Sequence, residues 1–227
     1  MKAMILAAGR GERMGSLTSK SPKPLIQVNG VSLIERNIKH ISEAGIKDIV
    51  ININWLGDQI LEALGTGERL GVKITYMDER KELLGTGGGI LNSLSILGEN
   101  PFWLVNADVF SSYKIDIRKT LHKDSFGHLI LVPNPKHNSR GDFFLEKGKI
   151  RYTEGLKPYT YSGISLLSDK LFKKYNKKIF PLEPLLVEAS LSSKLTGELF
   201  NGLWIDVGTQ ERLNKAENLT LSKETSS

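Results

Sequence analysis

Residues suited to binding phosphate follow the first apolar segment of the chain. Residues 2–8 have the composition of a buried strand, and Gly9, Gly11 and Arg13 come directly after them in the sequence GRGERM. Glycine lets backbone N–H groups approach phosphate oxygens, and the arginine supplies positive charge. The loop lacks the third glycine of a dinucleotide fingerprint and the Gly-Lys-Ser/Thr of a Walker A loop. It predicts a nucleoside triphosphate site, with a plain surface turn as the alternative.

A lysine between two prolines supplies a second cation. Lys23 is flanked by Pro22 and Pro24. Both prolines restrict the backbone, so we expect an extended segment with little conformational entropy. The pattern alone is compatible with a functional or a structural lysine.

Two aspartates follow apolar strand-like runs. Asp108 ends the segment FWLVNAD, and Asp206 lies in WIDVGT. Mg²⁺ prefers one or two protein carboxylates together with phosphate oxygens. Either aspartate alone is equally compatible with a capped turn. Together with Arg13 and Lys23, the pair predicts a site for a divalent cation.

Further polar and glycine-rich segments are weaker candidates. LGTGGG at residues 84–89 opens a predicted helix that Thr86 is expected to cap, and its glycines leave room for a flat ligand such as a base, or simply form a flexible turn. Gly141 and Glu154 lie in polar loops, where a backbone amide and a carboxylate are suited to a sugar. The four histidines show no metal or triad spacing, so we interpret them as structural or surface residues.

The elements that must position these residues alternate in type. Apolar runs at residues 48–53, 72–77 and 102–106 predict strands, and residues 32–44, 57–64 and 87–97 predict helices between them. This alternation indicates an α/β fold with a parallel sheet covered on both faces, in which ligands bind at the carboxyl ends of the strands. The second half predicts strands at 129–133, 159–167, 195–200 and 203–207, a hairpin over 143–151 and helices at 181–191 and 209–219.

Length and composition bound the class of protein. The 227 residues with no cysteine predict one domain over residues 1–222, with a nucleotide-binding half of about residues 1–110 and a sugar-binding lobe of about residues 111–208. Residues 223–227 are expected to form a flexible tail. No signal peptide or membrane span is predicted, so we expect a cytoplasmic protein. The net charge of +6 suits small phosphorylated ligands, and the lysine-rich run 170–178 is interpreted as a solvated helix end rather than a nucleic-acid patch.

Five segments in one order resemble the sugar-1-phosphate nucleotidylyltransferase family. They are GxGxRM, PKPL, LGTGGG, NAD and WIDVGT, and they span residues 3–209. The resemblance implies a Rossmann-like, nucleotide-diphospho-sugar transferase (GT-A-like) fold with a mixed, mostly parallel sheet, and an Mg²⁺-dependent enzyme. NWLGDQI at 54–60, the triple glycine at 87–89 and the loop at 134–143 resemble the members that use UTP and N-acetylmuramate 1-phosphate in peptidoglycan recycling.

The same resemblance implies roles for individual residues. Arg13 would contact the triphosphate and the leaving pyrophosphate, Lys23 would bridge the α-phosphate and the incoming phosphate, and Asp108 and Asp206 would hold Mg²⁺. The implied nucleotide-binding set is Ala8, Gly9, Gly11, Glu12, Arg13, Lys23, Gly85, Thr86 and Asn106. The implied sugar-binding set is Asn106, Arg140, Gly141, Glu154 and Ser162. Assigning Arg140 to the lactyl carboxylate of muramate is our own hypothesis.

Three departures from the family pattern bear on this reading. Many relatives have a glutamine that reads the pyrimidine before the Gly-Thr pair, where this chain has the stretch 80–83, RKEL, and Ser16 replaces a common proline. The base therefore depends on the resemblance alone. We also expect no C-terminal β-helix domain, which is compatible with a monomer. Another sugar (glucose, mannose or N-acetylglucosamine 1-phosphate), another base, or a non-catalytic nucleotide sensor stay as alternatives.

Overall fold

The first half of the chain forms a parallel sheet wrapped by helices. The computed structural model describes residues 1–224, with side chains to residue 219. Its first strands are β1 (Lys2–Leu6), β4 (Asp48–Ile53), β5 (Lys73–Asp78) and β6 (Phe102–Asn106), and its first long helices are α2 (Leu33–Glu43), α3 (Gly57–Leu64) and α4 (Gly85–Leu97). The strands pair in parallel in the order β5-β4-β1-β6. The chain reverses its direction of travel across the sheet between β1 and β6, the usual place for a ligand in such sheets.

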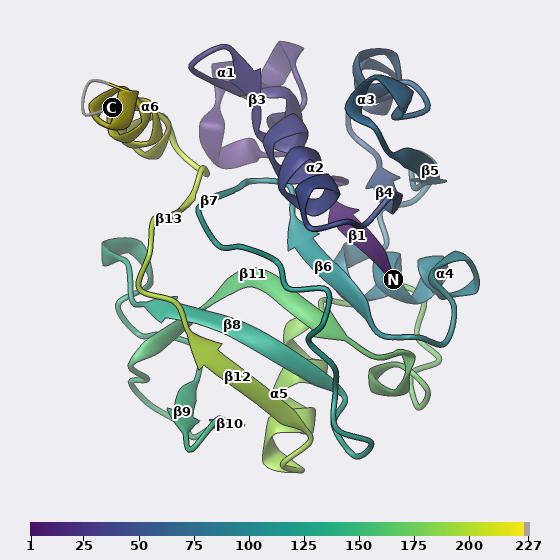
Figure 1. Ribbon diagram of the computed structural model, residues 1–227, viewed down its shortest axis with the longest axis vertical. Helices are drawn as coiled ribbons and strands as arrows, with labels where there is room; N and C mark the ends of the chain where they lie inside the picture. The colour runs from purple at the N-terminus through teal and green to yellow at the C-terminus, as the bar shows by residue number, and fades with distance from the viewer. Residues whose placement is uncertain (225–227) are drawn as a thin grey trace.

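The second half extends the same sheet with mixed pairing. Its elements are β8 (Gly127–Pro133), β9 (Phe144–Glu146), β10 (Lys149–Arg151), β11 (Tyr159–Leu167), α5 (Glu183–Leu191) and β12 (Leu195–Leu199). β11 runs antiparallel to both β6 and β8, whereas β12 is parallel to β8. The complete order is β5-β4-β1-β6-β11-β8-β12-β10-β9, so a single nine-stranded sheet crosses both halves (Figure 1).

Further elements lie outside the nine-stranded sheet. They are α1 (Ser16–Lys20), β2 (Gln27–Val28), β3 (Val31–Ser32), β7 (Val109–Ser111), β13 (Trp204–Asp206) and α6 (Gln210–Glu224). β7 and β13 form an antiparallel ribbon outside the main sheet. The ribbon brings the segment before α6 back against the segment that follows β6.

Apolar side chains bury both faces of the sheet. Strand residues alternate between the two faces, so Ala3 and Ile5 of β1 pack with α2 and α3, whereas Met4 packs with α4 and α5. Helix α2 begins with a capping box. Its Ser32 Oγ accepts from the Glu35 N–H (3.3 Å) and donates to the Glu35 carboxylate (2.7 Å).

The architecture confirms the expected α/β fold class with its mixed sheet. The predicted strand 48–53 and the predicted helix 57–64 have the bounds of β4 and α3. The predicted hairpin turns at Lys147 and Gly148, which both have positive φ, the geometry of a two-residue turn between twisted strands. The short strands β2, β3 and β7 were not predicted. The expected flexible tail, 223–227, lies partly outside the described residues, and α6 extends to Glu224.

No helix within residues 1–224 is both long enough and apolar enough to cross a membrane.

Candidate functional site

A cavity of about 530 Å³ opens where β1 and β6 end. It is lined by every residue expected to bind nucleotide, namely Ala8, Gly9, Gly11, Glu12, Arg13, Lys23, Gly85, Thr86 and Asn106. Asp108 also lines it. The carboxyl ends of adjacent parallel strands meet here, so side chains far apart in the sequence face one space. Its volume is that of a small-molecule site.

The glycines of the first loop have different roles. Gly11 has φ +69°, and a Cβ there would lie 3.0 Å from both the Lys23 Cβ and the Thr18 Cγ2. It is therefore required for the loop to pack against Lys23. A Cβ on Gly9 would meet nothing within 4 Å, so its backbone is open to the cavity.

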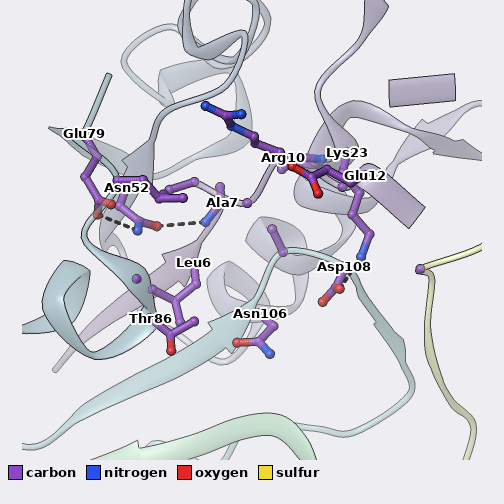
Figure 2. A pocket seen from close by; sticks show the side chains of 18 of the residues that line it. Leu6, Ala7, Arg10, Glu12, Lys23, Asn52, Glu79, Thr86, Asn106 and Asp108 are labelled. Carbon is purple, nitrogen blue, oxygen red and sulfur yellow. Dashed lines mark hydrogen bonds and ion pairs between the residues drawn. The ribbon is translucent and has the colours of Figure 1, made fainter. Parts of the chain in front are cut away.

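Lys23 and Asp108 both line the cavity, and their side chains form an ion pair (Figure 2). The lysine side chain is 12% exposed and the aspartate side chain 28% exposed. The expected extended conformation at Lys23 is wrong, because a 3-10 turn begins at this residue. The turn is closed by Leu25 N–H to Pro22 O (2.9 Å) and Ile26 N–H to Lys23 O (3.1 Å).

Asp206 ends β13 and is paired with Val109, the residue that follows Asp108. The Val207 N–H donates to the Asp108 carbonyl oxygen (2.8 Å), which joins the two acidic segments. The Asp206 carboxylate accepts two bonds from Arg212 Nη1, at 3.0 and 2.9 Å, and lies 3.1 Å from His137 Nε2. Sequence reasoning missed Arg212, and it interpreted His137 as an ordinary structural or surface residue.

The two aspartates suit a divalent cation only in combination with a ligand. Within the described residues, no group of three or more His, Cys, Asp or Glu side chains could hold a metal. Mg²⁺ commonly takes one or two carboxylates and completes its shell with phosphate oxygens and water. Asp108 and Asp206 each already have a cationic partner, in Lys23 and Arg212, so each lies where positive charge is stabilised. Carboxylates are ligands that Mg²⁺ prefers, but only Asp108 of the two lines the cavity, so the metal site stays a prediction.

A buried network of hydrogen bonds connects the end of β1 with the start of α4. Figure 2 shows its bonds among Ala7, Asn52 and Glu79. The Ala7 N–H donates to Asn52 Oδ1 (2.8 Å), Asn52 Nδ2 donates to Glu79 Oε1 (2.8 Å), and the Leu84 N–H donates to Glu79 Oε2 (3.1 Å). Glu79 is 2% exposed, and burial raises the pKa of its carboxyl above the ordinary value despite these hydrogen bonds. This hydrogen-bond network fixes the relative positions of three strand ends around the cavity.

Asn52 and Glu79 both line the cavity, and sequence reasoning missed them. Asn52 is a polar residue near the end of the otherwise apolar run DIVINI, and Glu79 follows β5 directly. A polar residue at the carboxyl end of a buried parallel strand is a signal that would have found both.

The triple glycine packs against protein rather than leaving room for a base. A Cβ on Gly87 would overlap the Phe180 ring, and one on Gly88 would overlap the Lys178 carbonyl oxygen. The N–H groups of Gly87 and Gly88 both donate to the Phe180 carbonyl oxygen, at 3.0 and 3.1 Å. These glycines therefore seat the segment before α5 on the first turn of α4.

The expected capping role of Thr86 is also wrong. Helix α4 begins at Gly85, its N-cap is Leu84, and no side chain caps it. The Thr86 hydroxyl accepts instead from the Leu182 N–H (2.8 Å). Its partner lies nearly a hundred residues away, so no local pattern indicates it.

Apart from Asn106, the sugar-binding candidates lie outside the cavity lining. Arg140 and Glu154 are exposed on loops of the second half. Gly141 has φ +62°, a backbone conformation that favours glycine, and its N–H donates to the Asn138 carbonyl oxygen (3.1 Å). Ser162 is 1% exposed, and its hydroxyl accepts from the Ile164 N–H (3.2 Å). The sugar contacts stay predictions.

Sequence comparison identifies relatives over nearly the whole chain. The sequence model of the family described as nucleotidyl transferase matches residues 2–141, which is more than half of the chain. An N-acetylmuramate alpha-1-phosphate uridylyltransferase of Neisseria meningitidis serogroup B is 41% identical, covering 96% of this chain and 98% of the relative. A mannose-1-phosphate guanyltransferase of Aspergillus fumigatus is 29% identical over 92% of this chain, which spans 61% of that longer protein.

Solved structures agree in fold. A Bacillus anthracis protein crystallised with sucrose superposes with a TM-score of 0.83 at 24% identity, covering 96% of this chain and 94% of that one. HddC from Yersinia pseudotuberculosis, in complex with GMP-PN, superposes with a TM-score of 0.79 at 22% identity, covering 96% and 99%. At these identities the likeness establishes the fold alone, and it confirms the GT-A-like architecture.

Proposed function

The chain belongs to the nucleotidyl transferase family, and from this premise we propose that it transfers a uridylyl group from UTP to N-acetylmuramate 1-phosphate. The products are UDP-N-acetylmuramic acid and pyrophosphate, and the reaction serves the recycling of cell-wall sugars. Sugar-1-phosphate nucleotidyltransferase activity follows from the family and its relatives. The observation that carries the choice of base and sugar is the 41% identity to the Neisseria uridylyltransferase over nearly the full length of both proteins.

The geometry of the cavity supports this type of reaction. A sugar phosphate oxygen attacks the α-phosphorus of the nucleotide in line, the bond to the β-phosphate oxygen breaks, and pyrophosphate leaves. Such a transfer needs alignment and charge neutralisation more than acid–base groups. The cavity provides Arg13 and Lys23 as cations, and backbone around Gly9 that is open to a ligand.

Each charged residue has a defined place in the proposed mechanism. Lys23 neutralises the α-phosphate and the incoming phosphate, and Arg13 binds the leaving pyrophosphate. Asp108 and Asp206 are the residues that would hold Mg²⁺, which when bound neutralises charge on the phosphates. Lys23 is paired with Asp108 in this structure, and its ammonium group has further N–H donors for the phosphates.

A pyrophosphate-release assay tests the proposal. The protein is incubated with Mg²⁺ and each of UTP, GTP and dTTP, in combination with the 1-phosphates of N-acetylmuramate, N-acetylglucosamine, glucose and mannose. We expect the highest kcat/KM for UTP with N-acetylmuramate 1-phosphate, a UDP-sugar of the matching mass, and no turnover in EDTA. The matched control is Lys23→Ala, which should release no pyrophosphate above background.

Other outcomes of this assay identify the alternatives. Faster release with GTP and mannose 1-phosphate would favour the activity named for the Aspergillus relative. Release from no nucleotide–sugar pair would favour a non-catalytic nucleotide sensor.

A further inference from the structure

Arg212 lies where the helix itself does not favour a cation. It occupies the first turn of α6, which begins at Gln210. The N-terminus of a helix carries partial positive charge, so an arginine there is unfavourable unless something else holds it. Here the Asp206 carboxylate holds it, through bonds of 3.0 and 2.9 Å from Nη1, and the arginine side chain is only 12% exposed.

The other guanidinium nitrogen of Arg212 faces the cavity wall. A Cβ on Gly208 would overlap Arg212 Nη2 and would lie 3.6 Å from Arg13 Nη2. Gly208 and Arg13 both line the cavity. Two guanidinium groups thus lie near the same point, the position that a Cβ of Gly208 would occupy.

The charges at this point are not balanced. Asp206 neutralises Arg212, whereas Arg13 is exposed and has no ion pair within the described part of the chain. Arg212 Nε is buried and has no hydrogen-bond partner among the described residues. Two like charges in proximity favour a multiply charged anion between them, and guanidinium groups bind phosphate oxygens in pairs.

We propose that Arg212 binds the pyrophosphate end of the nucleotide together with Arg13, and that Asp206, which would also hold Mg²⁺, positions the Arg212 guanidinium. This inference rests on the proposed function, in which pyrophosphate is the leaving group. Gly208 has no side chain, which leaves space for Arg212 Nη2 beside the cavity wall.

The rival explanation is that Arg212 only neutralises Asp206. An ion pair of this burial leaves an uncompensated charge when one partner is removed, so Arg212→Gln alone does not separate the two explanations. Replacing both Arg212 and Asp206 separates the two explanations. If Arg212 acts only through Asp206, its substitution has no further effect in an Asp206→Asn background.

Calorimetric titration with inorganic pyrophosphate tests the proposal without turnover. Affinity is measured in EDTA for the unaltered protein, Arg212→Gln, Asp206→Asn and the Asp206→Asn/Arg212→Gln double variant. We expect Asp206→Asn to bind pyrophosphate more tightly than the unaltered protein, because a repelling carboxylate is gone. Adding Arg212→Gln to that background should weaken binding by about tenfold or more, the effect of one charge-assisted hydrogen bond.

Three controls accompany the titration. Arg69→Gln removes an exposed arginine that pairs with Glu35, and it should leave pyrophosphate affinity unchanged. UMP, which lacks the pyrophosphate group, should bind Asp206→Asn and the double variant equally. Arg212→Lys keeps the charge, so in the Asp206→Asn background it should retain more affinity than Arg212→Gln. If Arg212→Gln does not fold alone, the double variant, which leaves no unpaired partner, still gives the answer.

Equal pyrophosphate affinity of Asp206→Asn and the double variant would overturn the proposal. This result is separable from a failure of the proposed function, because the titration contains neither sugar nor turnover. Absence of transfer to any sugar 1-phosphate, with the Arg212 effect present, would reject the proposed function and keep the pyrophosphate site. Normal transfer without the Arg212 effect would reject the site alone.

Discussion

Asp108 and Lys23 show how two short motifs become one chemical unit. They are 85 residues apart in the sequence, and their side chains meet because the segment after β6 lies beside the 3-10 turn that begins at Lys23. Lysine presents a compact point charge, and an aspartate next to it keeps that charge at the cavity wall. Both groups are thus in place before substrate arrives.

Replacing Asp108 with alanine should nearly abolish turnover while the fold survives. The side chain is 28% exposed and lines the cavity, so its loss removes a proposed metal ligand and little core packing. We expect kcat to fall by at least about 100-fold, the loss seen when one group that stabilises a transition state is removed. Pyrophosphate release at saturating Mg²⁺ measures the effect, and a thermal melt checks the fold. Asp124→Ala, an exposed acid beside His122, is the control. Near-normal rates for Asp108→Ala would remove this residue from the mechanism.

Replacing Arg140 with alanine should select between sugars. Its side chain is exposed, and the loop is held by its backbone, whose carbonyl oxygen accepts from the Lys157 N–H (2.7 Å). If Arg140 contacts the lactyl carboxylate, the variant loses kcat/KM for N-acetylmuramate 1-phosphate by about tenfold or more, and little for N-acetylglucosamine 1-phosphate. Lys136→Ala, in the same loop, is the charge-matched control. An equal effect on both sugars would reject the assignment.

The glycine-rich elements around the cavity differ in what surrounds them. The first loop has open space at Gly9, whereas the first turn of α4 is covered at Gly87 and Gly88 by the segment before α5. Helix α4 therefore borders the site with Gly85 and Thr86, while its triple glycine serves the packing of two elements.

Alanine substitutions at Gly9 and Gly88 should affect different properties: ligand binding at Gly9 and the free energy of unfolding at Gly88. Gly88→Ala overlaps a backbone carbonyl and should lower the free energy of unfolding by about 1–3 kcal/mol, the range for overpacked sites. Gly9→Ala meets no protein atom within 4 Å, so it should leave stability nearly unchanged and weaken UTP binding by placing a methyl group in the cavity. Urea unfolding and UTP titration of both variants measure the two effects. A stable Gly88→Ala variant would contradict the packing role.

A polar cluster links distant parts of the second half. Glu198 of β12 accepts from the Tyr113 hydroxyl (2.7 Å) and pairs with Lys119, and its carboxylate lies 3.3 Å from His128 Nε2 of β8. Burial raises the pKa of Glu198, but the hydrogen bonds from Lys119 and Tyr113 outweigh it and leave the pKa below its ordinary value. Burial, together with the Lys119 charge, lowers the pKa of His128.

The Glu198–His128 cluster should therefore contribute less to the stability of the molecule as the pH falls. Below its ordinary pKa of 6.5, His128 takes up a proton in the unfolded chain before it does so in the folded one, which favours unfolding. The stabilisation from Glu198 is present above its ordinary pKa of 4.5 and is lost as pH falls through its lower folded value. Urea unfolding from about pH 7.5 down to about pH 5, a range centred on ordinary histidine titration, measures the loss. His128→Gln should show a smaller loss over this range than the unaltered protein. Equal losses would contradict the assignment.

The sequence determined most of the elements and many of the residues that line the cavity. Apolar periodicity placed β4, α3, β6 and β11 at their bounds, because that signal is local and reflects which face each element buries. Glycine, arginine and lysine in the first loops were singled out because they suit phosphate, and Gly9, Gly11, Arg13 and Lys23 do line one cavity, whereas their binding of phosphate stays a prediction. Short motifs of this kind carry their own chemistry.

The tertiary structure decided which side chains meet. The bonds from Thr86 to Leu182, from Asn52 to Glu79 and from Arg212 to Asp206 depend on how elements pack. The small ribbon of β7 and β13 brings the last of these pairs beside the segment that follows β6. These contacts depend on which side chains are buried and on the order of strands in the sheet. A local sequence pattern encodes neither of these two properties.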